Sequence, residues 1–318
     1  QGTSTTMAAV APPASFMDKQ TLSKARVLVT GDAMLDRYWF GDAERISPEA
    51  PVPVVRISRT EERLGGAANV AVNIASVGGR SSLLCVVGND EPGRTLERFA
   101  REQGITPHFQ FDESLDTTVK LRVVARQQQM LRCDFESHPA EEVLDKFRAL
   151  LAEHDALILS DYGKGGLSHI VSMIAMARDA GIPVLIDPKG DDYSRYRGAT
   201  MLTPNRSELR QVVGSWRTEE ELTAKAQGLR AELGLKYLLL TRSEEGMTLY
   251  FEGGQITVPT QAREVYDVSG AGDTVIAILA TMLATGMTVE EAVRTANRAA
   301  GVVVGKLGTA TVSYEELF

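Results

Sequence analysis

The sequence predicts an α/β protein in which helices cover both faces of a parallel β-sheet. Short apolar runs that end in glycine or aspartate have the character of buried strands. Segments whose apolar residues recur with helical spacing alternate with these runs along the chain. Such alternation is typical of parallel sheets, whose ligands collect beyond the carboxyl ends of the strands.

Ordered structure is expected to begin with a strand over residues 26–31, followed by a helix over 66–77. Further strands are expected at 82–88, 156–160, 183–187, 201–203 and 236–241. Further helices are expected near 90–103, 141–153, 167–180, 205–213, 218–233, 271–285 and 288–305. Residues 1–25, rich in serine, threonine, alanine and proline, are predicted to be a flexible leader, and residues 26–318 one domain.

Two segments depart from this alternation and predict a small separate sheet. At 119–123 and 131–135 the apolar residues occupy odd positions, which is the period of half-buried strands. With 52–57 they are expected to form a lid drawn from about 37–58 and 118–136. Its charged face would carry Lys120, Arg122 and Arg132. Because an exposed apolar face needs a partner, a homodimer through two lids is predicted; the alternative is a hairpin packed on its own domain.

Composition and charge exclude several classes of protein. The chain has 34 basic and 42 acidic residues, a net charge of −8, which argues against a nucleic-acid or membrane partner. The apolar run at 275–280 is far shorter than a membrane span needs. Cys85 and Cys133 lack the spacing of a disulfide scaffold or zinc site, which predicts a reducing compartment, the cytoplasm.

The most informative motif is Asp267–Asp273, directly before an apolar helix. Its glycines allow a tight turn, so the backbone amides of Gly270, Ala271 and Gly272 can converge as an anion hole at the helix N-terminus. Asp273, in the first helical turn, could accept a proton from an incoming hydroxyl. The alternative is an aspartate that only stabilises the helix dipole, and the motif alone does not decide between them.

A second glycine turn leads into the helix predicted at 66–77. Gly65 and Gly66 precede Asn69, and together with Asp32 and Asp36 this amide offers the donors and acceptors that suit sugar hydroxyls. The alternative is a plain helix start with a solvated asparagine.

Polar residues follow other predicted strands. Asn205 and Glu208 form a capping box by spacing, and the same pair could hold a hydrated magnesium ion; locally, capping is favoured. Lys164 and Lys189 could neutralise a phosphate as point charges. Gly246 could bring the backbone close to a flat nucleotide base. The chain lacks the Walker P-loop pattern and has no G-x-G-x-x-G after its first strand.

In this order, Gly65-Gly66-x-x-Asn69, Asn205-x-x-Glu208 and Gly270-Ala271-Gly272-Asp273 resemble the ribokinase or PfkB family of carbohydrate kinases, over residues 26–313. The resemblance implies a ribokinase-like three-layer α/β/α sandwich with a small β-sheet lid. It also implies that the chain uses ATP and Mg²⁺ to phosphorylate a sugar, whether it is a stand-alone kinase or a kinase domain. Longer stretches resemble the branch of the family that phosphorylates the anomeric C1 hydroxyl of a heptose 7-phosphate: 31–40, 45–54, 160–165 and 303–309.

The resemblance also assigns roles. It implies Asp273 as catalytic base and residues 270–272 as the anion hole. The expected sugar-phosphate ligands are Asp32, Asp36, Gly65, Gly66, Asn69, Arg122, Arg132, Asp161, Lys164 and Lys189. The expected ATP ligands are Asn205, Arg206, Ser207, Glu208, Thr241, Arg242, Gly246 and Asn297. No residue is expected to bind metal directly, although Glu208 could do so through water.

Two other functions stay open at this point. One is a kinase of the same family for another sugar or sugar phosphate. The other is a nucleotide-binding regulator without turnover, which the presence of Asp273 together with both glycines argues against.

Overall fold

The computed structural model describes residues 17–139, 143–262, 265, 268, 270–308 and 310–318. Within them, a nine-stranded sheet has the order β13-β12-β11-β10-β9-β8-β1-β4-β5. The parallel strands are β1 (Arg26–Gly31), β4 (Arg80–Gly88), β5 (Ile105–Asp112), β8 (Ala156–Ser160), β9 (Val184–Asp187), β10 (Met201–Leu202) and β11 (Tyr237–Thr241). An antiparallel edge is added by β12 (Met247–Phe251) and β13 (Gly254–Val258).

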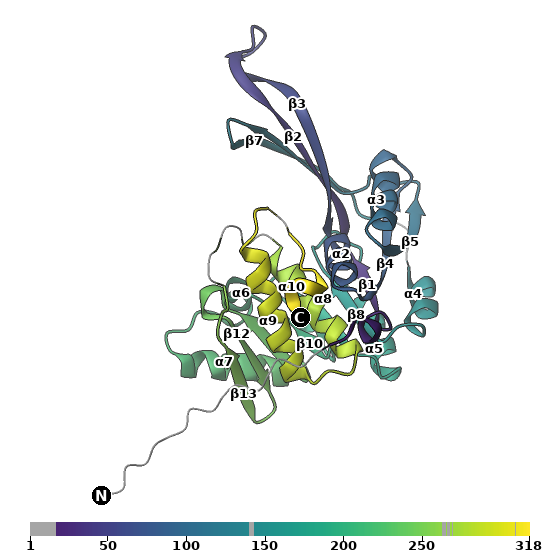
Figure 1. Cartoon of the computed structure of the whole chain (residues 1–318), viewed down its shortest axis with the longest axis vertical. Helices are drawn as coiled ribbons and strands as arrows, with labels where there is room; N and C mark the ends of the chain where they lie inside the picture. The colour runs from purple at the N-terminus through teal and green to yellow at the C-terminus, as the bar shows by residue number, and fades with distance from the viewer. Residues whose placement is uncertain (1–16, 140–142, 263–264, 266–267, 269, 309) are drawn as a thin grey trace, which may run out of the picture.

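Helices cover both faces of this sheet (Figure 1). One face packs against α1 (Lys19–Leu22), α2 (Ala67–Val77), α3 (Glu91–Glu102), α8 (Ala271–Ala284), α9 (Val289–Val304) and α10 (Tyr314–Leu317). The other packs against α4 (Leu144–Leu151), α5 (Ile170–Asp179), α6 (Arg206–Val213) and α7 (Glu219–Glu232). Val27 and Val29 of β1 belong to the first core and Leu28 to the second, as expected for a strand buried on both sides. The three-layer α/β/α sandwich is therefore confirmed.

A separate four-stranded sheet projects from the α/β body and forms the lid (Figure 1). Its order is β3-β2-β6-β7, with bounds β2 (Ala33–Ile46), β3 (Pro53–Gly66), β6 (Val119–Ala125) and β7 (Gln128–Phe135). The predicted antiparallel pairing of 119–123 with 131–135 is confirmed, and Arg122 lies opposite Arg132. Strand β3 is longer than the predicted 52–57 and runs straight into α2.

Other elements differ from the predictions. Strand β2 was expected only in part, as the segment of the lid that begins near residue 37, because it is buried only at residues 33–35 and the rest lacks an apolar run. Strand β5 was not expected, because it is an edge strand interrupted by Pro107. The end of the predicted leader contains α1, whose Leu22 is fully buried, so order begins earlier than expected. Residues 1–16 of the leader, 141–142 of a predicted helix and Thr309 lie outside the described residues. Among the described helices, none combines the length and apolar character that crossing a bilayer requires.

Candidate active site

A cavity of about 170 Å³ lies where the lid meets the body, at the N-termini of α2 and α8. It brings together predicted residues from four separate segments: Asp36, Gly65, Gly66, Asn69, Arg122, Gly270 and Asp273. It adds residues that the sequence analysis did not assign to the site: Met34, Arg63, Leu64, Lys120 and Tyr162. From strand β6, Lys120 and Arg122 line this cavity, so the apolar side chains that alternate with them face away from it.

Asp273 lies in the first turn of α8 and is only 9% exposed. Asn69 donates its side-chain amide to Asp273 Oδ2 at 2.8 Å, and the Tyr162 hydroxyl donates to Oδ1 at 3.1 Å. Burial raises the pKa of Asp273 to about 6, although both hydrogen bonds act in the opposite direction. The carboxylate is therefore ionised at neutral pH but accepts a proton more readily than an exposed aspartate.

The start of α8 fits the predicted anion hole in part. Gly270 adopts φ of 77° as the N-cap, a conformation that favours glycine. The Ala271 amide donates to Val268 O at 3.3 Å, which leaves it less free than expected. Gly272 is exposed, and a Cβ there would meet no atom within 4 Å, so open space adjoins this helix N-terminus. Asp267 and Ser269 of the motif lie outside the described residues.

The glycine pair before α2 lets β3 and β2 approach closely. A Cβ at Gly65 would lie 2.4 Å from Asp36 Oδ2, and one at Gly66 would lie 2.3 Å from Asp32 O. Gly66 has φ of 60°, which an L side chain rarely adopts. The turn starts α2 at Ala67 and places the Asn69 side chain within hydrogen-bond distance of Asp273.

A second contact fixes α2 against α8. Thr274 donates its hydroxyl to Asn73 Oδ1 at 2.9 Å, and Asn73 donates to Asn69 O at 2.8 Å. Asn73 and Thr274 are completely buried. The amide that binds the Asp273 carboxylate is thus held by the packing of two helices.

The lid supplies cations to the same cavity. Arg122 donates to Asp36 Oδ1 at 2.9 Å, and Arg63 pairs with Glu61 at 3.0 Å. Lys120 makes no ion pair among the described residues, and burial, helped by Lys164 and Arg132, lowers its pKa. These cations repel one another, and a bound anion would relieve that repulsion, so this part of the cavity is a candidate anion site.

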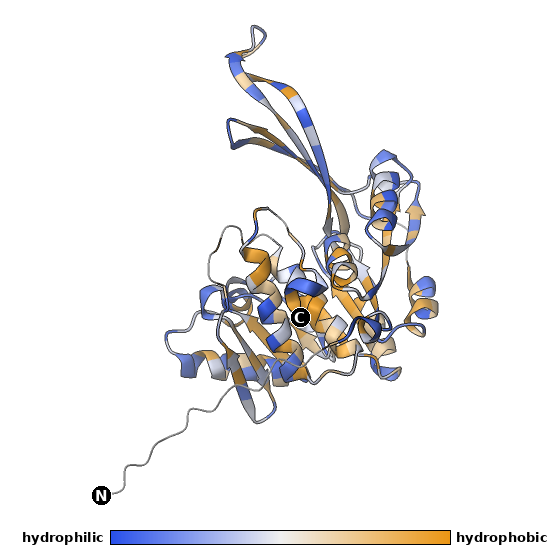
Figure 2. Ribbon diagram, viewed as in Figure 1, coloured by the Kyte–Doolittle hydropathy of each residue, from blue (hydrophilic) through white to orange (hydrophobic). Residues whose placement is uncertain are grey.

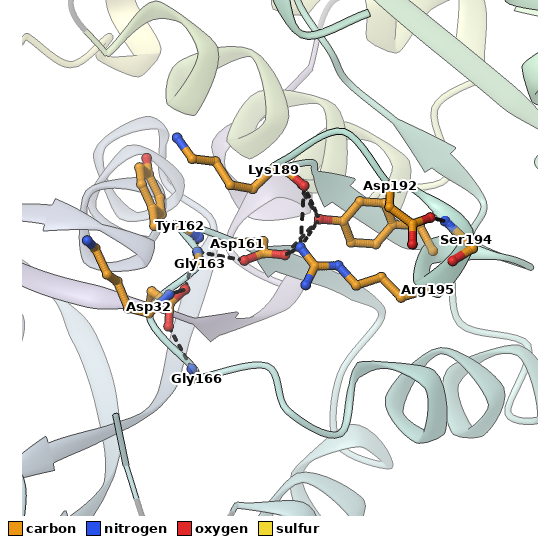
Figure 3. Close-up of polar contacts among 11 residues, drawn as sticks. Asp32, Asp161, Tyr162, Gly163, Gly166, Lys189, Asp192, Ser194 and Arg195 are labelled. Atoms are coloured by element: carbon orange, nitrogen blue, oxygen red, sulfur yellow. Dashed lines mark hydrogen bonds and ion pairs between the residues drawn. The ribbon is translucent and has the colours of Figure 1, made fainter. Parts of the chain in front are cut away.

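Asp32 has a task different from the predicted one. Its carboxylate accepts backbone hydrogen bonds from Tyr162, Lys164 and Gly166, at 2.9, 3.1 and 2.8 Å (Figure 3). Asp32 is 5% exposed and does not line the cavity. It holds the loop after β8, and its contact with sugar stays a prediction.

Other predicted ligands are also engaged away from the cavity. Asp161 accepts from Gly163 N at 2.8 Å and Tyr196 OH at 2.7 Å and pairs with Arg195 (Figure 3). Lys164 pairs with Glu136, and Arg132 pairs with Asp134 at 2.9 Å. Lys189 has an exposed side chain. None of these residues lines the cavity of Asp273, and their contact with the sugar phosphate stays a prediction.

On the predicted nucleotide side, the side chains that make contacts bind either the protein's own backbone or its own glutamates. Asn205 and Glu208 form the predicted capping box, Asn297 donates to Pro259 O at 2.7 Å, and buried Arg242 pairs with Glu219 and Glu245. A Cβ at Gly246 would lie 1.9 Å from Val258 O, so the strand that carries Val258 requires a glycine here, and contact with a nucleotide base stays a prediction. Arg206 forms an ion pair with Glu244 at 3.3 Å, and the backbones of Thr241 and Asn205 form an isolated parallel β-bridge. Ser207 is exposed on the first turn of α6.

Asp187 is a candidate that the sequence analysis left unassigned. It ends β9, and burial, together with the charges of Asp273 and Glu208, raises its pKa well above the usual range. Burial also raises the pKa of Glu208. A divalent cation would offset such crowded negative charge, although the described residues contain no cluster of three or more histidine, cysteine or acidic ligands.

Comparisons with known proteins agree with this geometry. Residues 24–316 match the family described as pfkB family carbohydrate kinase. The chain is 56% identical over 302 residues to a D-beta-D-heptose 7-phosphate kinase of Bordetella bronchiseptica, covering 94% of this chain and 96% of that protein. It is 54% identical to the bifunctional protein HldE of Methylococcus capsulatus, covering 93% of this chain but only 63% of that protein.

Solved structures support the fold. An Arabidopsis thaliana ribokinase complexed with ribose and ATP superimposes with a TM-score of 0.74 at 20% identity, covering 92% of this chain and 96% of that one. Escherichia coli phosphofructokinase-2 gives a TM-score of 0.76 at 20% identity with the same coverage. The ribokinase-like fold is therefore confirmed.

We expect Asp273→Asn to stabilise the folded protein at pH 8. The pKa of Asp273 is about 6 in the folded protein and about 3.9 in an unfolded chain, so the ionised carboxylate costs folding free energy at pH above 6. Asparagine cannot ionise, and the gain should reach at most about 3 kcal/mol. Urea unfolding at several pH values measures it: the gain should be full above pH 6 and should disappear as the pH falls towards 4.

Asp145→Asn is the matched control, because the Asp145 side chain is 95% exposed. It should change stability little at any pH. A variant of Asp273 that is less stable than the parent protein at pH 8 would contradict the expectation.

Proposed function

We propose that this chain, which belongs to the pfkB family of carbohydrate kinases, transfers the γ-phosphoryl group of ATP to the anomeric C1 hydroxyl of a heptose 7-phosphate. The observation that carries the proposal is a buried, hydrogen-bonded Asp273 that shares one cavity with the cationic face of the lid. The 56% identity to a protein named for heptose 7-phosphate supports this choice of sugar.

Asp273 would act as the base for the attacking hydroxyl. Asn69 and Tyr162 hold its two oxygens, so the carboxylate has a fixed orientation when the sugar arrives. Phosphoryl transfer passes through a loose transition state in which alignment and charge stabilisation matter more than base strength. The N-terminus of α8, beside Gly272, would face the negative charge of the transferred group.

Arg63, Lys120 and Arg122 are the proposed partners of the 7-phosphate. They replace the earlier candidates Lys164, Lys189 and Arg132, which do not line the cavity. Arg122 reaches from β6 to Asp36, so it could bind a phosphate while Asp36 accepts from a sugar hydroxyl. The pair would thus recognise both ends of a sugar phosphate.

Asp187 and Glu208 fit the Mg²⁺ that accompanies ATP. Both are carboxylates whose ionised form lacks a sufficient counter-charge in the protein. Bound there, the ion would supply charge neutralisation for the phosphate chain. Asn205–Glu208, Thr241, Arg242, Gly246 and Asn297 shape the edge of the body on which we place the nucleotide.

We also propose that two copies pair through the apolar face of the lid. Trp39 and Leu131 align with Val123 in one row across the sheet, on the side opposite Arg122. Leu131 and Phe135 are 56% and 53% exposed. Figure 2 shows apolar residues along these projecting strands, where no part of the body covers them. A second copy offers the same self-complementary face.

The reaction would yield a heptose 1,7-bisphosphate, which the resemblance places on the route to ADP-heptose and the lipopolysaccharide inner core. The cytoplasm, where ATP is available, is the proposed compartment.

An ADP-release assay tests the proposal directly. Heptose 7-phosphate should give turnover, whereas ribose, fructose 6-phosphate and unphosphorylated heptose should give at least tenfold lower kcat/KM. Asp273→Asn should lower kcat by a factor of about 10² to 10⁴, the usual contribution of a positioned base. Turnover with another sugar phosphate at higher efficiency would identify a different kinase of the family, and near-normal turnover of the variant would remove Asp273 as the base.

Arg122→Gln tests the anion site. We expect KM for the 7-phosphorylated sugar to rise about tenfold to a hundredfold, since a hydrogen bond to a charged group contributes about 1.5–3 kcal/mol. KM for ATP should be unchanged. The control variant is Arg148→Gln, on α4, which should also leave KM for ATP unchanged. An equal loss of affinity for phosphorylated and unphosphorylated sugar would count against the assignment.

Leu131→Glu tests the dimer. Light scattering should give twice the chain mass for the parent protein and the mass of one chain for the variant, because the glutamate would be buried without a partner. Val171→Glu, at a 64% exposed apolar site on α5, should leave the mass unchanged. A monomeric parent protein would refute the pairing.

A further inference from the structure

One of the two hydrogen bonds to the Asp273 carboxylate comes from a loop, whereas the other comes from a helix. Asn69 is held by the packing of α2 on α8, but Tyr162 comes from residues 161–166, which follow β8 without regular structure. A loop can hold a donor in place only if the loop itself is held. The protein fixes this one with two buried carboxylates.

Asp32 is the first of these anchors. It collects the amides of Tyr162, Lys164 and Gly166 within a span of five residues, and Figure 3 shows its carboxylate facing the loop. A Cβ at Gly166 would lie 2.5 Å from Asp32 Oδ1, so the loop passes close against the carboxylate. Burial raises the pKa of Asp32, and the three amides offset part of that cost.

Asp161 is the second anchor. It accepts from Gly163 N and binds Tyr196 OH and Arg195, which lie in the segment after β9 (Figure 3). Arg195 also reaches Lys189 O at 3.3 Å. The loop is therefore fastened on both sides of Tyr162, and it is tied to the segment that follows Asp187.

The phenol of Tyr162 is suited to donate. Burial, reinforced by the charges of Asp273 and Asp187, raises its pKa far above neutrality, so it keeps its proton. It can then stabilise the ionised form of Asp273. Each carboxylate oxygen has two acceptor positions, so those not used by Tyr162 and Asn69 remain for a sugar hydroxyl.

We propose that Tyr162 is a positioning residue that orients the Asp273 carboxylate and favours its ionised form, and that Asp32 and Asp161 hold the loop for this purpose. The inference rests on the proposed function, in which Asp273 is the base. Other charged groups around Asp273 act alongside it. They are Asp36 on β2, Asp187 at the end of β9, Arg63 on β3, and Lys120 and Arg122 on β6.

Tyr162→Phe keeps the ring and removes only the donor. In the ADP-release assay, the acidic limb of the kcat/KM profile should move up by about one pH unit, giving about a tenfold loss below that limb and near recovery at pH 8.5. Tyr237→Phe is the matched control, because Tyr237 lies on β11, separated from β8 by β10 and β9. Its profile should equal that of the parent protein.

A second readout needs no turnover. The stability gain of Asp273→Asn, followed by urea unfolding against pH, reports the titration of Asp273. Measured in the Tyr162→Phe background, its midpoint should lie about half a pH unit higher, because the pKa of Asp273 in the unfolded chain does not change. This separates the two ideas: a parent protein inactive on every sugar phosphate would refute the proposed function, whereas the midpoint would still decide the role of Tyr162.

An unmoved acidic limb, an unmoved midpoint, or a loss of activity that is equal at all pH values would overturn the inference. The last result would show that the hydroxyl matters only for packing. Equal melting temperatures of Tyr162→Phe and the parent protein at pH 5, where Asp273 is largely protonated, would show that the fold is intact.

Discussion

The site depends on keeping one carboxylate ionised where water has little access. Asp273 is almost fully buried, and burial alone would favour its neutral form. Two side-chain donors reverse part of that effect, and each comes from an element that must be placed accurately. The helix pair α2 and α8 places Asn69, and the loop after β8 places Tyr162.

The same requirement explains features that otherwise look unrelated. The glycine pair at 65–66 lets β3 end against Asp36 and start α2 at the depth that Asn69 needs. Gly31 would place a Cβ 2.0 Å from Ser160 O, so β1 and β8 approach closely just where Asp32 meets its loop. Both are constraints on backbone approach: Gly31 ends the parallel strand β1, and Gly66 lies against the backbone of Asp32, the next residue.

Most of the fold could be predicted from the sequence because buried parallel strands and amphipathic helices carry strong periodic signals. The exceptions lacked that signal: β2 is buried only at residues 33–35, and β5 is an edge strand containing proline. Within the site, Asp36, Asn69 and Asp273 were predictable because they sit in glycine turns or at strand ends. Asp32 and Asp161 have the same local pattern, yet their carboxylates bind backbone, and only three-dimensional contacts reveal that difference. Tyr162 and Arg63 were missed because a single tyrosine or arginine in a polar stretch carries no spacing signal.

The charged and apolar faces of the lid both follow from the alternation of side chains along its strands. The body places Asp187, Glu208 and Asp273 beyond the carboxyl ends of its strands, and Asp36 of β2 lies near them, so a substrate bearing phosphate would be repelled unless cations approached from elsewhere. The lid provides them on the even positions of β6, where Lys120 and Arg122 face the cavity. Because side chains alternate along a strand, Val119, Leu121 and Val123 must then face the opposite way. Val119 and Leu121 are buried within this chain, whereas Trp39, Leu131 and Phe135 on the same face are exposed. The alternation that turns the cations towards the cavity therefore leaves these three side chains on the opposite face as the surface for a partner.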